Sequence, residues 1–203
     1  MTTYSHSRLS TYETCPLAYR YRYIDRIKPE EAPEGIEAFM GSRVHETLEK
    51  RYRDLIRSKQ NSLDDILAYY ADIWHKSWHE NVVVVKDGYT PENYYATGAK
   101  AIWDYYVRYA PFDDSKTIGL ELKVPIDIDG YRLVGYIDRL SETEDGHYQI
   151  RDYKTSGTLP TQRDVNNDRQ LALYQIGLYD MRSDVKDVDL IWHYLVFDKE
   201  IRS

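Results

Sequence analysis

Hydrophobic and polar positions follow two different rhythms along the chain, and the change falls near Pro111. Before it, apolar residues recur every three to four positions, the spacing of helices that bury one face. The expected helices span residues 8–24, 36–58, 63–80 and 91–109, with a loop at 28–35 after the first. Pro16 should bend or divide the first helix, and Pro91 suits the first turn of the last.

After Pro111 the rhythm changes to a period of two and the β-branched content rises, as in strands with one buried face. We expect strands at residues 117–128, 131–140 and 147–155, a helix at 168–181 and a last strand at 187–197. Asp129-Gly130 and Asp145-Gly146 mark the hairpin turns. This order predicts an α/β (α+β) fold in which a mixed central β-sheet, with three consecutive antiparallel strands and a further strand, is flanked by helices.

The length of 203 residues suits a single domain with one full core. We divide it into an N-terminal helical segment (1–34), a core helix (35–58), a helical insertion (59–112) and a sheet with its C-terminal helix and strand (113–203). The 21 tyrosines suit buried cores or interfaces better than a dedicated base-stacking surface.

Charge and composition indicate where the protein is located and what it does not bind, more than which reaction it catalyses. The net charge of -7 argues against a protein that coats nucleic acid nonspecifically, since phosphate contacts need clustered cations. The basic run at residues 50–57 is expected on a solvated helix face. No apolar run approaches the ~18 to 20 residues of a membrane helix, the N-terminus does not resemble a signal peptide, and the single Cys15 cannot form an internal disulfide. We therefore expect a cytoplasmic protein without membrane association.

A carboxylate and an ammonium stand two positions apart in Asp152-Tyr153-Lys154. On a strand this spacing points both side chains to one face. Cleavage of a phosphodiester needs an activated water and compensation for charge on the phosphoryl oxygens, which a divalent metal and a nearby Lys provide together. As an isolated tripeptide, however, such a pair is far more often an ordinary feature of a strand surface.

Asp138 on the neighbouring strand strengthens the case, because Mg²⁺ prefers several hard oxygen ligands. The two aspartates share a face only if the turn between the strands sets the right register. A two-residue Asp145-Gly146 turn would place the carboxylates on opposite faces. A loop of three residues (144–146), with Gly146 left-handed, would set Asp138 opposite Asp152. We predict that loop or another of odd length.

Further positions are candidates for the same site. His45 lies inside the 36–58 helix, and Gly41, one turn earlier, leaves space there for a metal or a close strand at a cost of about 1 kcal/mol relative to Ala. Helix packing beside an ordinary His is the competing interpretation. Gln170 and Tyr174 share one helix face and could reach a substrate phosphate or the attacking water, although an amphipathic helix explains them as well. Glu121 is a secondary candidate, because alternation alone does not decide where it points.

Other chemistries have little support in the sequence. It contains no Gly-rich phosphate loop, no nucleophile elbow and no zinc-type Cys/His spacing. His75 and His79 are four positions apart on an expected helix but lack the Glu of a metalloprotease motif. We expect both to be surface residues.

Taken together, these segments resemble the PD-(D/E)XK nuclease superfamily, and within it the RecB-like group that includes the nucleases of CRISPR spacer acquisition. The resemblance spans nearly the whole chain. Five motifs carry it, in this order: Ser5-His6-Ser7-Arg8-Leu9 with Tyr12, Cys15-Pro16 and Tyr19-Arg20-Tyr21; Gly41 with His45; Gly135-Tyr136-Ile137-Asp138-Arg139; Asp152-Tyr153-Lys154-Thr155; and Gln170-Leu171 with Tyr174. Each motif alone is weak, and the set in this order and spacing is highly specific.

The resemblance implies a restriction-endonuclease-like core and a site for Mg²⁺ or Mn²⁺. The implied metal ligands are His45, Asp138, Asp152 and the main-chain carbonyl of Tyr153. Lys154 would assist the attacking water, while Gln170 and Tyr174 would support the substrate and the catalytic geometry. The helices of the insertion would cover or thread DNA.

Cys15 is where the sequence departs from the group it resembles. Many RecB-like relatives bind a [4Fe–4S] cluster with one Cys near the start of the chain and three near the end. No further Cys follows here, so a [4Fe–4S] cluster is not expected in this chain as given. Either Cys15 is the first ligand of a cluster that a tail after Ser203 completes, which we favour, or it is a buried structural residue.

The function that the resemblance implies is a metal-dependent DNA nuclease, an exonuclease in particular, acting on single-stranded DNA or free ends. DNA repair, recombination and CRISPR adaptation are the expected settings, with helicases or CRISPR-adaptation proteins as candidate partners. The alternatives are a noncatalytic DNA-binding or assembly subunit that keeps the fold, and a hydrolase of another phosphoester.

Overall fold

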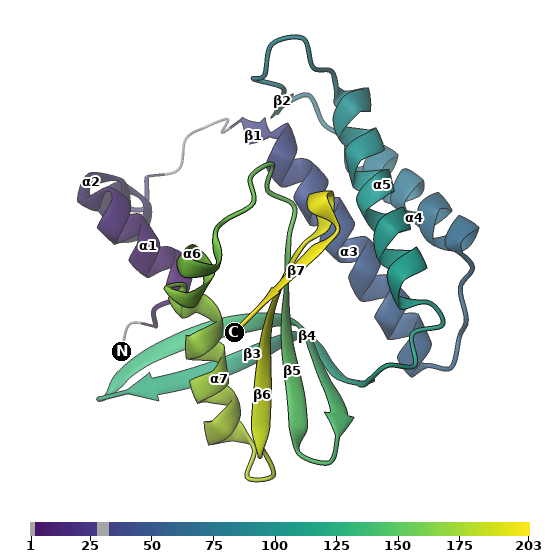
Figure 1. Ribbon diagram of the computed structural model, residues 1–203. Coiled ribbons are helices and arrows are strands. Elements are labelled where there is room, and N and C mark those ends of the chain that lie inside the picture. The colour runs from purple at the N-terminus through teal and green to yellow at the C-terminus, as the bar shows by residue number, and fades with distance from the viewer. Residues whose placement is uncertain (1–2, 28–32) are drawn as a thin grey trace.

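The computed structural model describes residues 3–27 and 33–203, and its centre is a five-stranded sheet in the order β3-β4-β5-β6-β7 (Figure 1). The strands span Lys116–Ile128 (β3), Tyr131–Glu144 (β4), His147–Lys154 (β5), Asp187–Tyr194 (β6) and Lys199–Arg202 (β7). Neighbouring strands are antiparallel except β5 and β6, which are parallel. The predicted mixed sheet with three consecutive antiparallel strands is confirmed.

Helices flank this sheet, as predicted. One group consists of α3 (Ile36–Ile56), α4 (Leu63–Ser77) and α5 (Pro91–Tyr109), while α7 (Arg169–Met181) packs on β3 to β6 (Figure 1). Because successive strand residues point to opposite faces, Tyr153 of β5 packs with α3 to α5 and Ile150 packs with α7. Among the described residues, none of the helices has a long enough apolar stretch to cross a membrane.

The N-terminal helical segment is divided into three short elements instead of forming the expected single helix. It consists of α1 (His6–Thr14), α2 (Pro16–Tyr19) and the π-helical turn η1 (Arg20–Ile24), so Pro16 divides the helix as expected. The hydroxyl of Ser5 caps α1 by accepting a hydrogen bond from the amide of Arg8 at 3.2 Å. Most of the predicted 28–35 loop, positions 28–32, lies outside the described residues.

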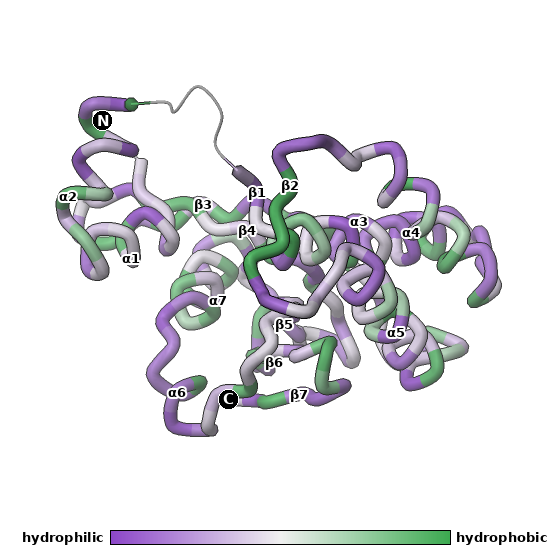
Figure 2. Tube along the Cα trace, turned by 90° about the horizontal axis from the view of Figure 1, so that it is seen from above, coloured by the Kyte–Doolittle hydropathy of each residue, from purple (hydrophilic) through white to green (hydrophobic). Residues whose placement is uncertain are grey.

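The N-terminal segment meets the sheet at the free end of the β3–β4 hairpin. Tyr4 exchanges two main-chain hydrogen bonds with β4, donating to Arg132 at 2.9 Å and accepting from Val134 at 2.8 Å. This part of β4 extends beyond the end of β5, so Tyr4 covers an otherwise open strand edge. Figure 2 shows α1 and α2 beside α7, on the far side from α4 and α5.

The turn between β4 and β5 is shorter than the predicted three-residue loop. Glu144 pairs with His147, so the turn has two residues, Asp145 and Gly146. Gly146 is left-handed, with φ 78°, as predicted. We expected such a turn to separate the two aspartates, and on its own it would.

A β-bulge at Thr143 restores the register. The pairing shifts by one residue between Glu142 and Glu144, which leaves Thr143 as the extra residue on β4. From the bulge onward the ladder reaches Arg139 opposite Arg151. The predicted alignment of the aspartates is therefore achieved by a different device, a tight turn followed by a bulge.

Several short elements were not predicted. They are β1 (Glu34–Gly35) and β2 (Val82–Val83), which pair with each other, α6 (Gln162–Asn166), and β7. The predicted last strand ends early, because residues Leu195–Phe197 form a 3-10 turn and Asp198 is left-handed, with φ 47°. This reversal turns the chain back, so that β7 pairs with β6.

Candidate metal centre

The two predicted aspartates meet where the ladder between β4 and β5 ends. Arg139 and Arg151 are the last residues of that ladder, and Asp138 and Asp152 are the next ones on each strand. The amide of Tyr153 donates to Oδ2 of Asp138 at 2.7 Å. A side chain of β4 thus accepts a main-chain hydrogen bond from β5, which holds the carboxylate of Asp138 between the strands.

Lys154 lies on the same face of β5 as Asp152, as the spacing predicted. Its Nζ is 2.6 Å from Oδ2 of Asp152. Gln170 of α7 contacts both: its amide nitrogen donates to Asp152 Oδ1 at 2.9 Å, and its amide oxygen accepts from Lys154 Nζ at 3.1 Å. The same amide nitrogen also donates to the hydroxyl of Tyr174 at 3.0 Å. Gln170 therefore orients the carboxylate and the ammonium together.

Two features place α7 against the strands. Asp168, which the sequence reasoning counted only as the start of the helix, caps α7 by accepting from the amide of Gln170 at 2.7 Å. Gly135 of β4 leaves room for the ring of Tyr174, because a Cβ there would lie 2.2 Å from Tyr174 Cε1. The glycine of the Gly135–Arg139 motif is thus explained by the close approach of α7.

Gly135→Ala is expected to destabilise the protein by about 1–3 kcal/mol, because the added methyl overlaps the buried ring of Tyr174. Urea unfolding measures the change. Gly157→Ala is the matched control, since a Cβ at Gly157 meets no described atom within 4 Å and its φ is not left-handed. Equal stability of the two variants would show that the Tyr174 contact does not require glycine.

His45 of α3 approaches the same carboxylate from another side. Its Nδ1 is 3.6 Å from Asp138 Oδ2, and its ring meets the ring of Tyr153 edge-on at 5.9 Å between centroids. The space left by Gly41 is used by Thr155, the residue directly after β5, since a Cβ at Gly41 would lie 2.7 Å from Thr155 Oγ1. The close approach of the chain at the end of β5 therefore accounts for this glycine.

Glu121 of β3 also belongs to this cluster. One ligand atom each of His45, Glu121 and Asp138 lies within 4.8 Å of the others. Glu121 is left-handed within the strand, with φ 45°, a conformation that is uncommon for a residue with a side chain. Such strained positions concentrate at functional sites. The secondary candidate of the sequence is thus a full member of the observed cluster.

The carboxylates of this cluster are partly buried and have little positive charge around them. Burial, followed by the charge of Asp152, raises the pKa of Asp138 well above its usual range, and burial also raises the pKa of Glu121. Burial lowers the pKa of His45, against the opposing charge of Asp152, so the ring is neutral, the form that ligates metals. Lys154 is the ammonium within bonding distance of Asp152.

These residues fit a divalent cation with a preference for oxygen. Oδ2 of Asp152 is buried and pairs with Lys154 Nζ at 2.6 Å, and a carboxylate oxygen that accepts one such bond still has a lone pair for a metal. Carboxylates and one neutral imidazole form a donor set suited to Mg²⁺ or Mn²⁺. A bound cation would also relieve the repulsion among the carboxylates of Glu121, Asp138 and Asp152.

The other sequence candidates lie outside the cluster. Cys15 is exposed, which corrects the expectation of a buried structural residue, and its Sγ accepts from the amide of Ala18 at 3.5 Å as the cap of α2. His75 and His79 are exposed, as predicted. His79 Nε2 lies 2.9 Å from a carboxylate oxygen of Glu34.

Comparison with known proteins identifies the family of the chain. No curated protein matches the chain closely enough to count as a relative. A sequence model of the PD-(D/E)XK nuclease superfamily matches residues 3–200, nearly the whole chain. The chain therefore belongs to the PD-(D/E)XK nuclease superfamily.

Proposed function

We propose that this protein is a divalent-metal-dependent deoxyribonuclease of the RecB-like group, and that it degrades DNA from free, single-stranded ends. The observation that carries the proposal is the convergence of Asp138, Asp152 and Lys154, each from a motif of the family, with His45 from α3. The RecB-like assignment follows from the N-terminal motif and from Gln170 with Tyr174. The setting we propose is cytoplasmic DNA repair, recombination or CRISPR adaptation, where a helicase or an adaptation protein would present the strand.

We assign metal binding to His45, Asp138, Asp152 and the main-chain carbonyl of Tyr153, with Glu121 as a further ligand. When bound, Mg²⁺ or Mn²⁺ supplies Lewis-acid activation of water and of the phosphodiester. The protein side chains supply the ligand geometry, which the β4–β5 register and the main-chain bond from Tyr153 to Asp138 maintain.

The remaining roles fall on the β5–α7 contact. The ammonium of Lys154 stabilises charge on the phosphoryl oxygens and orients the attacking water. Gln170 is a positioning residue, because it holds both Lys154 and Asp152. Tyr174 in turn holds Gln170 through its hydroxyl. Loss of either positioning residue should therefore lower the cleavage rate more than the affinity for metal.

A cleavage panel tests the proposal. Linear DNA labelled at either end and circular DNA, each both single- and double-stranded, are incubated with Mn²⁺, with Mg²⁺ or with EDTA. Metal-dependent loss of linear single strands, with circles intact, is the expected result. Cleavage of circles would show an endonuclease instead. Binding of DNA without cleavage under every metal, or hydrolysis of other phosphoesters alone, would overturn the proposal.

A further inference from the structure

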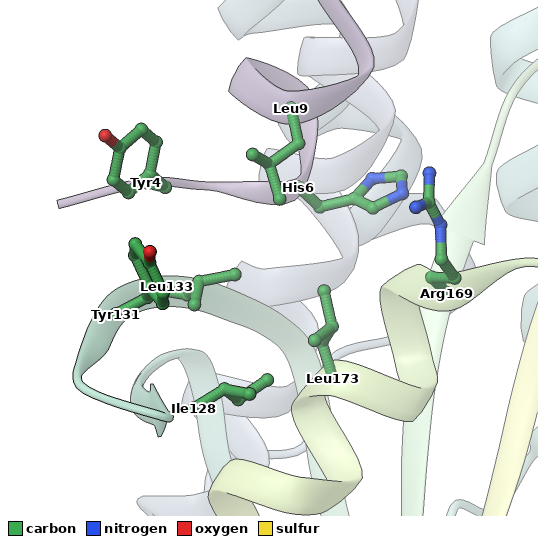
Figure 3. A pocket seen from close by; sticks show the side chains of 8 residues that line it. All are labelled: Tyr4, His6, Leu9, Ile128, Tyr131, Leu133, Arg169 and Leu173. Atoms are coloured by element: carbon green, nitrogen blue, oxygen red, sulfur yellow. The ribbon is translucent and has the colours of Figure 1, made fainter. Parts of the chain in front are cut away.

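A pocket of about 400 Å³ lies beside the metal centre, on the neighbouring face of α7 (Figure 3). Arg169 and Leu173 line this pocket, whereas Gln170 and Tyr174 contact the metal centre. Successive helix residues are separated by about 100° around the axis. The two pairs, each spanning one turn, therefore occupy adjacent faces of α7, and one helix forms a wall of both sites.

Three separate segments build the pocket: the start of α1, the free end of the β3–β4 hairpin, and α7. Its floor is apolar and includes Leu133 and Leu173. The rings of Tyr4 and Tyr131 stand at one end, and the imidazole of His6 and the guanidinium of Arg169 face each other at the other end (Figure 3). The pocket thus offers aromatic and apolar surface at one end and nitrogen donors at the other.

We propose that this pocket receives an unpaired nucleobase of the DNA strand that is cut at the metal centre; the inference rests on the proposed nuclease function. Aromatic rings and an apolar floor suit the face of a base, which stacks without regard to sequence. A base inside a duplex is stacked and paired, so only an unpaired base enters such a pocket without a further cost in energy. The volume falls within the range of about 300–1,000 Å³ typical of small-ligand pockets.

The cationic end suits the phosphate that accompanies the base. Arg169 is held by an ion pair between its Nη2 and Glu13 at 2.6 Å, while its side chain remains 61% exposed. A guanidinium carries five N–H donors, so this pair leaves donors for a phosphate oxygen. Since Arg169 directly precedes Gln170, a strand with its base in the pocket would continue toward the metal centre. An apolar peptide would use the floor but not these cations.

Binding without cleavage tests the inference. The full-length protein is titrated, with Ca²⁺ in place of Mg²⁺, into a short 5′-fluorescein-labelled oligothymidylate, and fluorescence anisotropy reports the affinity. Tyr131→Ala should weaken binding by about 5- to 150-fold, the range for loss of one stacked base. Tyr131 is 67% exposed at a hairpin turn, so its truncation leaves the core unchanged. Tyr179→Ala, at an exposed tyrosine of α7 outside the pocket, should bind as wild type.

The cationic end has its own matched pair of variants. Arg169→Gln should weaken binding several-fold, whereas Arg182→Gln should not. Arg182 follows the opposite end of α7 and forms a comparable ion pair, with Asp184 at 2.8 Å. Equal effects of the two substitutions would show a general loss of positive charge, and would overturn the assignment of Arg169 to the pocket.

A set of oligonucleotides with one abasic position each identifies the base. Wild-type affinity should fall at one position or two adjacent ones, and Tyr131→Ala should remove that dependence. A flat abasic profile, or unchanged affinity of Tyr131→Ala, overturns the inference even if the protein cleaves DNA. A position-specific loss in a protein that never cleaves DNA would instead support the pocket and refute the catalytic proposal.

Discussion

Lys154→Ala is expected to reduce metal-dependent DNA cleavage by about 10²- to 10³-fold, the usual cost of removing one group that stabilises transition-state charge. Burial alone would lower the pKa of Lys154, but the nearby carboxylates, Asp152 first and then Asp138 and Asp168, together outweigh it, so the pKa is raised and the side chain is an ammonium at neutral pH. That charge lies 2.6 Å from Asp152, a proposed metal ligand, but an ammonium does not itself ligate a cation. The variant should therefore lose rate while it keeps its affinity for metal.

Asp138→Asn should behave differently, because it removes a proposed metal ligand and should therefore abolish both Mn²⁺ binding and cleavage. Isothermal titration with Mn²⁺, beside cleavage assays and melting curves, separates the two variants. Lys199→Ala, at an exposed lysine of β7, is the control for loss of a lysine. Wild-type cleavage by Lys154→Ala would refute the assigned role. So would a loss of Mn²⁺ binding as large as that of Asp138→Asn.

The parts of the fold that depend on a few neighbouring residues could be predicted from the sequence. Pro91 begins α5, and Pro16 begins α2. Asp129-Gly130 forms the two-residue turn between β3 and β4, with both residues left-handed. In each case the chemistry of one or two side chains restricts the backbone directly.

The register that joins Asp138 to Asp152 could not be predicted from the turn alone. A bulge depends on how two strands pair and twist together, and no side chain near Thr143 signals it by itself. The expected loop of odd length gave the right register for a wrong reason, since the turn has two residues and the bulge supplies the third.

The direction of Glu121 was beyond sequence reasoning for a related cause. Alternation assigns faces only while the strand keeps extended angles, and the left-handed φ of Glu121 interrupts them. The register of β3 against β4 also shifts nearby, between Thr117 and Gly119. The side chain therefore reaches His45 and Asp138, although alternation along the strand does not predict which face it points to.

Buried cations are the largest departure from the sequence expectations. The basic run at residues 50–57 was expected to be solvated, and Arg53 and Arg57 are exposed as predicted. Arg51, however, is 2% exposed, and its guanidinium carbon lies 4.1 Å from the centre of the Phe112 ring. A charged side chain can still be buried where aromatic or acidic residues from distant parts of the sequence pack against it. Some of the tyrosines, by contrast, are buried as expected: the hydroxyls of Tyr52, Tyr105 and Tyr153 form a buried chain, with links of 2.7 and 2.9 Å.

Arg151→Met is expected to destabilise the protein by about 3–5 kcal/mol, the cost of removing one partner from a buried ion pair. Arg151 is 1% exposed, and its guanidinium donates to Glu200 at 2.5 Å, to the hydroxyl of Tyr109 at 3.1 Å and to Gln149 at 3.0 Å. Methionine fills most of the volume but leaves Glu200 without its buried cation. Urea unfolding gives the difference in free energy.

Arg202 provides the control, because it contacts the same carboxylate from solvent. Its Nη2 donates to the other oxygen of Glu200 at 2.9 Å, but its side chain is 51% exposed. Arg202→Met should therefore cost at most about 1 kcal/mol. Similar losses for the two variants would show that burial does not decide the strength of these pairs.

Adding Glu200→Gln to Arg151→Met should recover part of the stability, since it removes the uncompensated charge. Because Arg151 precedes Asp152 on β5 and points to the opposite face, this network anchors the strand from behind the proposed metal centre. Its loss should therefore lower stability far more than affinity for Mn²⁺.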